Sequence, residues 1–200
     1  MKRWKYIIAL LLLTGMLSLS ACAQYPEQTT DGTPWNQDWT MLGSVLGVED
    51  PENGFSLLNN YSLLTGEDIY YAAWTAGEPA DYTNEDNEDV QVYGAQIYLL
   101  VTGCADENHV KQNQEEWIAR QKQTYTVKET WSETRNGQEY TLLTYTCGSD
   151  TNPYQRGVSA FTAHGNYAVS AELVCRKDFV GQEREILLQF LDGCHYSFLE

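Results

Sequence analysis

From Trp39 onward, the pattern of apolar and polar residues is mostly that of β-strands. The strand-like segments are rich in aromatic and β-branched residues and are bounded by turn-forming residues. We predict strands at residues 55–58, 69–75, 90–101, 125–134, 139–146, 157–162 and 167–174. A short apolar run at 41–48 is cut by glycines, and a turn cluster follows at 50–54.

Three hairpins are expected to connect these strands. Asn136-Gly137 lies between two of them and is the strongest short hairpin signal, because both residues tolerate a positive φ. Gly165-Asn166 predicts a second hairpin. The stretch 69–101 predicts a third hairpin, with the acidic segment 77–89 at its tip.

Two segments show helical spacing instead. The first begins at a cap at residue 106 or 108 and runs to about residue 123, and the second covers about 182–191 before Gly193. The apolar stripe of the first contains Val110, Trp117 and Ile118. The apolar stripe of the second contains Ile186, Leu187, Phe190 and Leu191. Hairpins dominate this order of elements, which predicts an α+β fold: a mainly antiparallel sheet with two packed helices.

The first 21 residues have the three parts of a secretory signal peptide. A basic start contains Lys2, Arg3 and Lys5, an apolar run covers 6–19, and small residues precede Cys22. The apolar run has about 14 residues, whereas a membrane-spanning helix needs about 20. The alternatives are a signal anchor and an ordinary signal peptide that happens to precede a cysteine.

The tetrapeptide Leu19-Ser20-Ala21-Cys22 resembles the bacterial lipobox. The resemblance implies that a diacylglyceryl group is attached to the Cys22 thiol and that the chain is cut before this residue. Two acyl chains anchor a protein stably to a bilayer, whereas one does not. We therefore expect a signal peptide at 1–21, a lipidated tether at 22–38 and a single domain at 39–200, on the extracytoplasmic face of the cell membrane.

The charge of the chain limits its partners. The whole sequence has 12 Lys and Arg against 28 Asp and Glu, a net charge of −16. Removal of residues 1–21 leaves nine cations against 28 acids, a net charge of −19. Such a surface repels nucleic acid and anionic headgroups. The expected partners are the lipid bilayer, through Cys22, and an unknown envelope or extracellular partner.

Four cysteines follow Cys22, and an extracytoplasmic compartment permits disulfides. Their spacings of 43, 28 and 19 residues contain no Cys-x-x-Cys pair. The predicted strand directions favour the disulfides Cys104–Cys194 and Cys147–Cys175. The alternatives are a zinc site, whose usual close-paired ligands are missing, and reduced buried thiols.

The order of elements also resembles a known family. The opening strand Gly54-Phe55-Ser56-Leu57, the acidic hairpin, the helix in the middle of the chain, the Asn-Gly hairpin and the last amphipathic helix together resemble the PsbP-like α/β/α sandwich. Photosystem II extrinsic subunits, Ran-binding import factors and many bacterial lipoproteins share this fold. The resemblance covers roughly residues 50–195, and the chain is also similar to small lipoproteins of clostridial gut bacteria. It implies partner binding and assigns no catalytic residues.

Residues for nucleophilic catalysis are scarce. A nucleophilic Ser or Cys needs a nearby His, and the chain has three histidines, His109, His164 and His195, without a Gly-x-Ser-x-Gly motif. The conceivable pairs are Cys104 with His109 and Cys194 with His195. We interpret the cysteines as disulfide partners, the histidines as surface residues, and Trp74 and Trp117 as core residues rather than sugar-stacking rings.

The acidic segment 78–89 offers one weak cation site. Oxygen ligands at Asn84, Asp86 and Glu88 alternate as Ca²⁺ ligands do, but the EF-hand pattern is absent. We interpret the segment as a solvated hairpin tip and predict no resident metal or cofactor. The leading hypothesis is therefore a non-catalytic domain that binds a ligand or partner. The alternative is a cell-envelope hydrolase of the glycosidase type, based on two carboxylates.

Overall fold

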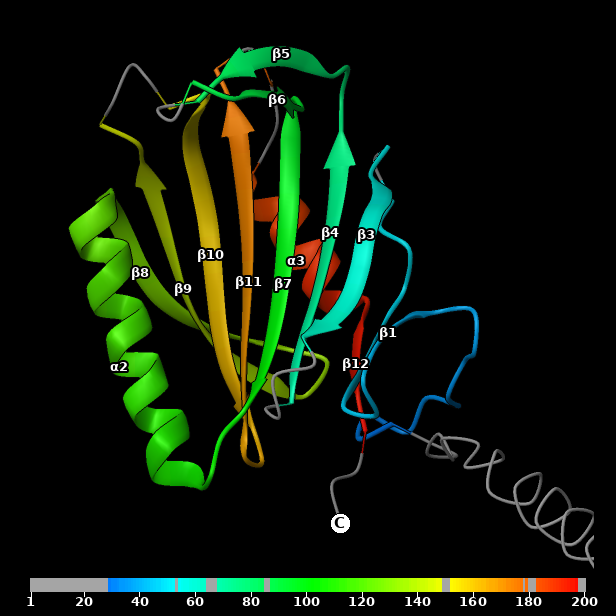
Figure 1. Cartoon of the computed structure of the whole chain (residues 1–200). Helices are drawn as coiled ribbons and strands as arrows, with labels where there is room; N and C mark the ends of the chain where they lie inside the picture. The colour runs from blue at the N-terminus through cyan, green and yellow to red at the C-terminus, as the bar shows by residue number, and fades with distance from the viewer. Residues whose placement is uncertain are drawn as a thin grey trace, which may run out of the picture.

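The computed structural model describes residues 29–52, 54–63, 68–84, 87–148, 152–177, 179 and 183–197. The predicted signal peptide and lipid-attachment residue Cys22 lie outside these residues. Within them, a seven-stranded sheet forms the centre of the domain (Figure 1). Its strands, in spatial order, are β3 (Ser56–Leu63), β4 (Ile69–Ala76), β7 (Ala95–Gly103), β11 (Tyr167–Arg176), β10 (Tyr154–His164), β9 (Gln138–Thr146) and β8 (Thr126–Arg135).

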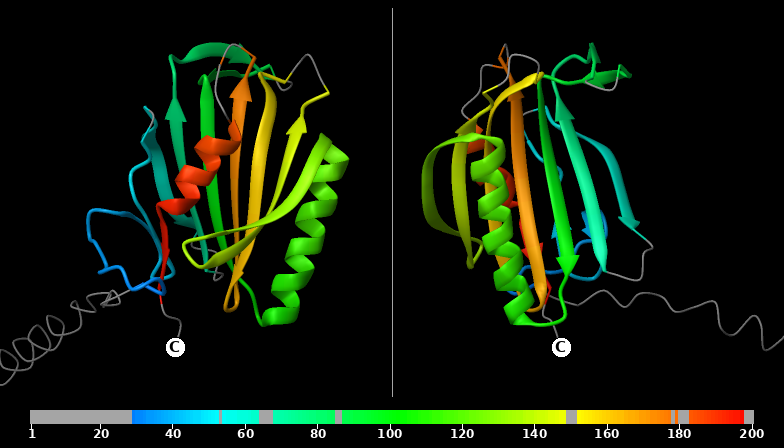
Figure 2. Two further views of the ribbon diagram at one scale, coloured as in Figure 1. Left: turned by 180° about the vertical axis from the view of Figure 1, so that it is seen from behind. Right: turned by 60° about the vertical axis from the view of Figure 1, so that its left-hand side comes forward.

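Every pair of neighbours in this sheet is antiparallel. The helices α2 (Glu107–Thr124) and α3 (Glu183–Asp192) lie on opposite faces of the sheet (Figure 2). The predicted α+β class, with a mainly antiparallel sheet and two packed helices, is thus confirmed. The hairpins at Asn136-Gly137 and Gly165-Asn166 are also confirmed, and Asn136 and Gly137 both have a positive φ, of 44° and 74°.

Alternate residues of the central strands point to opposite faces of the sheet and contribute to two hydrophobic cores, one on each face. Along β11, the odd-numbered residues Val169, Ala171 and Leu173 face α3, whereas Ala168 and Val174 face α2. The larger core lies on the α3 side and contains Trp74, whose ring meets the Phe190 ring edge-on at 5.0 Å. The smaller core lies on the α2 side and contains Trp117, Val110, Leu143 and Phe161. Both tryptophans therefore pack in the core, as predicted.

The strand predicted at 90–101 is divided in two. A small separate hairpin of β5 (Ala80–Thr83) and β6 (Asp89–Val92) contains the acidic segment, and β7 starts again at Ala95. The break falls at Gly94, where an added Cβ would lie 3.1 Å from the Ala76 carbonyl oxygen and 3.5 Å from the Gly77 Cα. This close approach of two backbones redirects the chain, so the acidic hairpin does not continue the main sheet.

The apolar run at 41–48 forms two short strands, β1 (Thr40–Leu42) and β2 (Leu46–Val48). They pair with β12 (Cys194–Tyr196) in a second small sheet, and β12 was not predicted. Thr29 forms a bridge with Ser197, and the Thr30 N–H donates to the Tyr196 carbonyl at 2.7 Å. Residues 29–38 therefore contact the domain, which corrects the predicted start at residue 39. Their hydrogen bonds are made to the far end of the chain, so local composition does not reveal them.

Candidate functional site

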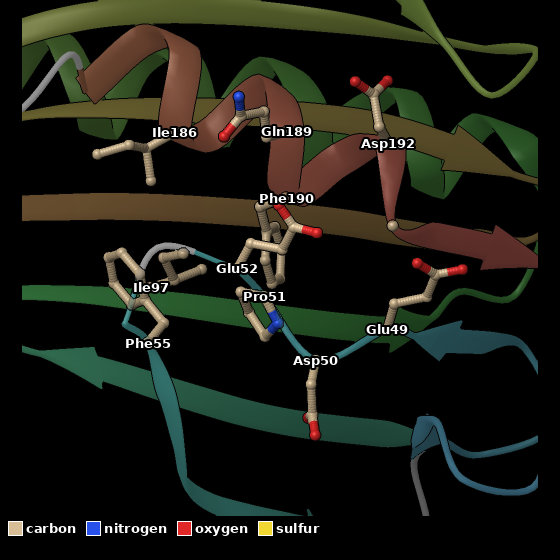
Figure 3. Close-up of a pocket in the computed structure, with 11 residues that line it drawn as sticks. Glu49, Asp50, Pro51, Glu52, Phe55, Ile97, Ile186, Gln189, Phe190 and Asp192 are labelled. Atoms are coloured by element: carbon tan, nitrogen blue, oxygen red, sulfur yellow. The ribbon is translucent and has the colours of Figure 1, made fainter.

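A pocket of about 280 Å³ lies between α3 and the segment that joins β2 to β3 (Figure 3). It has an apolar part and an acidic part. The apolar side chains are Pro51, Phe55, Ile97, Ile186 and Phe190. The acidic side chains are Glu49, Asp50, Glu52 and Asp192. Figure 3 shows Ile97, Phe55 and Ile186 together at one end, with the carboxylates of Glu49 and Asp192 at the other.

The turn at 50–54 builds one wall of this pocket. The sequence predicts a turn here, and Gly54 has φ +78°, a backbone conformation that favours glycine. The turn places Glu52 beside Phe190 of α3, whereas the Asp50 side chain points away from the helix (Figure 3), and the turn ends at Phe55, which is buried. Acidic residues therefore surround a floor that belongs to the hydrophobic core.

His195 holds the acidic end of the pocket in place. Its Nε2 lies 2.9 Å from Glu49 Oε1, and its Nδ1 lies 2.9 Å from Asp31 Oδ2. Its ring stacks on Trp39 at 4.3 Å with an interplanar angle of 9°. The imidazole can donate to both carboxylates at once only when both nitrogens are protonated. This hydrogen-bonded chain of Asp31, His195 and Glu49 connects the N-terminal segment to the pocket.

The position of Trp39 depends on a glycine in β2. His195 is directly opposite Gly47 in the small sheet, and an added Cβ at Gly47 would lie 2.6 Å from the Trp39 ring. The indole therefore lies against bare backbone and can reach the imidazole. Only glycine leaves this space.

The Asp31 carboxylate is strongly held. Burial alone would raise the pKa of Asp31, but hydrogen bonds from Thr29, Thr33 and His195 outweigh burial and hold this pKa well below its usual value. The Thr33 N–H donates to Asp31 Oδ1 at 2.8 Å. Asp31 is therefore ionised at neutral pH and offers His195 a negatively charged partner.

At the far side of the acidic end, Arg135 from the β8–β9 hairpin reaches α3. Its Nη1 lies 3.1 Å from Asp192 Oδ2, and its Nη2 pairs with Glu133 at 2.5 Å. Asn136 also donates from its side chain to the Asp192 carbonyl. Asp192 is thus compensated by a cation. Asp50 and Glu52 are exposed and form no ion pair with the residues that the structure describes.

The four cysteines are free thiols in the structure, which corrects the predicted disulfides. Their positions along the sheet agree with the predicted strand directions, because Cys147 follows β9 near the end of β11 that carries Cys175. The faces of the sheet on which the four cysteines lie do not agree with the predicted pairs. Cys104 and Cys147 pack on the α2 side, whereas Cys175 and Cys194 belong to the core on the α3 side. The sheet therefore separates the two members of each predicted pair.

Of the predicted cation ligands, Asn84 and Glu88 bind each other. The Glu88 N–H donates to Asn84 Oδ1 at 2.8 Å, and Asn84 Nδ2 donates to Glu88 Oε2 at 3.3 Å, so both close the hairpin turn. Asp86 lies outside the described residues. The described part of the chain contains no group of three His, Cys, Asp or Glu side chains that could hold a metal ion.

The three histidines differ in environment. His109 is exposed in the first turn of α2, where its N–H donates to the capping carboxylate of Asp106 at 3.0 Å. His164 Nε2 lies 2.7 Å from the Ser197 carbonyl oxygen, and burial lowers the pKa of His164. His195 is only 6% exposed, so its interpretation as a surface residue was wrong. The sequence offers one signal for this burial: His195 stands between Cys194 and Tyr196, and cysteine in particular is a residue type that is often buried.

Helices formed by the described residues are too short or too polar to span a bilayer.

No protein-family model matches the sequence, and no curated protein matches it. One similar solved structure is the solution structure of cyanobacterial PsbP (CyanoP) from Synechocystis sp. PCC 6803. The two chains share 11% identity over 74% of this chain and 97% of that chain, with a TM-score of 0.39.

Proposed function

We propose that this chain is a lipid-anchored, extracytoplasmic domain that binds a basic, partly apolar segment of an envelope or extracellular partner, without catalysis. The acidic pocket between α3 and residues 49–55 is the proposed binding site. The observation that carries the proposal is that this pocket combines apolar lining residues with four acidic side chains, Glu49, Asp50, Glu52 and Asp192. A PsbP-like assignment of the domain is part of the same proposal.

Lysine and arginine side chains fit such a pocket chemically. Each has an apolar stem and a cationic head, and such side chains bury the stem while the head stays near water or a counter-ion. The stem would lie against Phe55 and Ile186, with the cation beside Glu49 or Glu52. Arg135 pairs with Asp192 and His195 with Glu49, whereas Asp50 and Glu52 have no ion pair among the described residues, so these two carboxylates are open to a basic ligand.

The charge of the whole chain favours the same class of partner. A net charge of −16, or −19 without residues 1–21, attracts basic segments over long range and raises their association rate. The His195 hydrogen bond to Glu49 supports affinity in another way. It fixes one carboxylate before the ligand arrives, so less conformational entropy is lost on binding.

Attachment of lipid to Cys22 rests on the lipobox-like tetrapeptide. Seven peptide units separate Cys22 from Thr29, the first described residue, and at most they span about 25 Å. The end of the domain that carries Thr29 and Ser197 would then remain close to the membrane surface. Fatty-acid labelling of the wild type, compared with Cys22→Ala, tests this part of the proposal. Equal labelling of both chains would contradict it.

Fluorescence anisotropy with a labelled peptide of alternating lysine and leucine tests the binding site. A peptide in which glutamate replaces lysine serves as the probe of opposite charge. We expect the basic peptide to bind and the acidic one not to bind. The double variant Asp50→Asn/Glu52→Gln should weaken binding at least tenfold, because it removes two exposed carboxylates that line the pocket.

The matched control is Glu115→Gln/Glu116→Gln, which removes the same charge from the exposed face of α2. An equal loss in this control would mean that net charge, rather than the pocket, attracts the peptide.

A screen of the same chain against wall glycans, peptides and esters tests the absence of catalysis. Turnover that disappears in the Asp50/Glu52 double variant would favour the hydrolase instead.

A further inference from the structure

We propose that the outer edge of β3 is a docking site for an extended, uncharged segment of a different protein, which adds to the main sheet as a further strand. β3 is the last strand on one side of this sheet, and among the described residues only β4 pairs with it (Figure 1). The docking surface is formed by residues 56–60. It shares no residue with the lining of the acidic pocket and goes beyond the function proposed above.

This edge is open to solvent. All five residues from Ser56 to Asn60 are exposed. Leu57 and Leu58 are 44% and 46% exposed, the highest values among the exposed large apolar side chains of the described residues. The outer edge of such a strand presents unpaired backbone N–H and C=O groups, which can pair with another strand. The two leucines add apolar contact surface beside these groups.

The two edges of the main sheet differ in charge. The opposite edge is β8, which carries Lys128, Glu129, Glu133 and Arg135. Arg184 of α3 lies 3.7 Å from both of these glutamates. Charged side chains commonly protect an edge strand against pairing with other chains. β3 has no charged residue, since its sequence is Ser-Leu-Leu-Asn-Asn-Tyr-Ser-Leu, and it therefore lacks this protection.

A β-bulge limits the length of strand that β3 can bind. Leu57 is opposite Trp74 and Asn59 is opposite Ala73, so Leu58 is the extra residue of the bulge. A bulge interrupts regular pairing and increases the local twist, so it favours a short added strand over the long, flat pairing of a fibre. Five residues of a strand span about 17 Å, which is the length of segment that we expect to pair.

Charge and the position of the tether oppose a second copy of this chain as the partner. Each copy has a net charge of −16, or −19 without residues 1–21, so two copies repel each other. Two β3 edges related by a two-fold axis would also pair antiparallel, which places the two ends that carry Thr29 at opposite ends of the joined sheet (Figure 1). Under the lipid attachment proposed above, one of these ends would point away from the membrane.

The chemistry of β3 defines the segment that it binds. Backbone pairing needs an extended main chain with free N–H and C=O groups, and it specifies no sequence. The exposed leucines favour apolar side chains opposite them. Charged side chains are disfavoured because β3 offers no counter-ion. An extended segment of alternating β-branched and small polar residues meets these requirements.

Fluorescence anisotropy of the full-length chain in a nonionic detergent tests the site, with a capped, labelled peptide of alternating valine and threonine as the probe. In the matched probe, two adjacent central residues are replaced by proline. Neighbouring residues of a strand direct their N–H groups to opposite edges, so this change removes one donor from each edge. We expect the valine–threonine peptide to bind and the proline peptide to bind at least tenfold more weakly. Equal binding of both peptides would overturn the proposal.

One variant locates the binding at β3. Leu57→Lys/Leu58→Lys should weaken binding of the valine–threonine peptide at least tenfold, because it places charge on the edge and removes the apolar contacts. Both positions are exposed, so the change leaves the core intact. The matched control is Thr130→Lys/Ser132→Lys, which adds the same charge at exposed positions of β8 and should leave the affinity unchanged. An equal loss in this control, or a loss in the control alone, would overturn the assignment to β3.

Amide hydrogen exchange at residues 56–60 identifies the occupant. We expect exchange there to slow when the peptide is added, because the outward N–H groups become hydrogen-bonded. Exchange that is fully protected in the monomer without peptide would mean that another part of this chain covers the edge. A dimer in analytical ultracentrifugation that Leu57→Lys/Leu58→Lys dissociates would mean that a second copy does. Either result would overturn the proposal.

The acidic pocket is tested separately from this edge. Asp50→Asn/Glu52→Gln should leave the affinity for the uncharged peptide unchanged, whereas it should weaken binding of the basic peptide. Loss of the uncharged peptide in this variant would assign the peptide to the acidic pocket and overturn the proposal for β3. The two proposals therefore fail independently of each other.

Discussion

Glu49 Oε1 and His195 Nε2 lie 2.9 Å apart, and this hydrogen bond joins the wall of the acidic pocket to the last strand of the domain. The same imidazole reaches Asp31 through its other nitrogen. Three segments that are far apart in the sequence thus meet at one side chain. Their stability should be coupled, and the pocket should depend on residues that do not line it.

Replacement of His195 by alanine should destabilise the domain by about 2–3 kcal/mol, since it removes a buried group and leaves the Asp31 carboxylate without one of its donors. Glu49 is 53% exposed on its side chain, so the bond to Glu49 contributes little of this loss. Urea unfolding of the variant and of wild type measures the difference. His109→Ala, at an exposed position, is the control and should cost far less. A loss below about 0.5 kcal/mol in His195→Ala would show that the hydrogen bonds are not maintained in solution.

Asp31 should make the stability of the folded domain depend on pH, with stability lost on acidification. Its pKa is lower in the folded domain than in the unfolded chain, so the ionised form favours folding. The extra stability is fully present above the unfolded pKa of about 4 and is lost as the pH falls below it toward the folded pKa. Wild type should therefore lose its advantage over Asp31→Asn on acidification. Urea midpoints of both chains between pH 7 and pH 3 measure this, and a constant difference across that range would contradict the assignment.

The thiols should react in an order set by burial. Cys175 and Cys194 are buried, and burial raises the pKa of both, that of Cys175 to about 12. Cys104 and Cys147 are half-buried, and burial also raises the pKa of Cys147. Because the thiolate is the reactive form, iodoacetamide should label Cys104 and Cys147 in the native domain and reach the other two only after unfolding. Peptide mapping by mass spectrometry measures this order. Recovery of a Cys104–Cys194 disulfide would contradict the placement of these residues on opposite faces.

Local signals in the sequence predicted most of the main sheet. Asn136-Gly137 closes its hairpin as expected, because the turn type is determined by those two residues. The apolar stripe of α3 likewise predicts which face is buried, since Leu187, Phe190 and Leu191 all lie in the core. These features depend on neighbours within a few residues, and such neighbours are visible in a pattern.

The features that the sequence did not predict depend on contacts between residues that are far apart in the chain. The polar segment 29–38 has the composition of a tether, yet its partners are at residues 195–197. The disulfide prediction used the ends of strands but not their faces, although the two-residue period of β11 places Cys175 with Leu173 on the α3 side. The acidic pocket forms only where a turn folds over α3. The sequence shows both parts but not their contact.

Gly47 leaves room for the Trp39 ring that stacks on His195, so an alanine at this position tests how much that packing stabilises the domain. An added Cβ at Gly47 would lie 2.6 Å from the Trp39 ring, so Gly47→Ala must push the indole away from His195. We expect a loss of about 1–3 kcal/mol, the usual cost of overpacking a well-filled site. Gly148→Ala is the matched control, because nothing lies within 4 Å of an added Cβ there and the residue has no positive φ. Urea unfolding measures both variants, and near-ultraviolet circular dichroism follows the environment of Trp39. If Gly47→Ala were as stable as Gly148→Ala, the stacking of Trp39 on His195 would not hold the N-terminal segment. If the loss occurs together with weaker binding of the basic peptide, the imidazole positions Glu49 for the ligand.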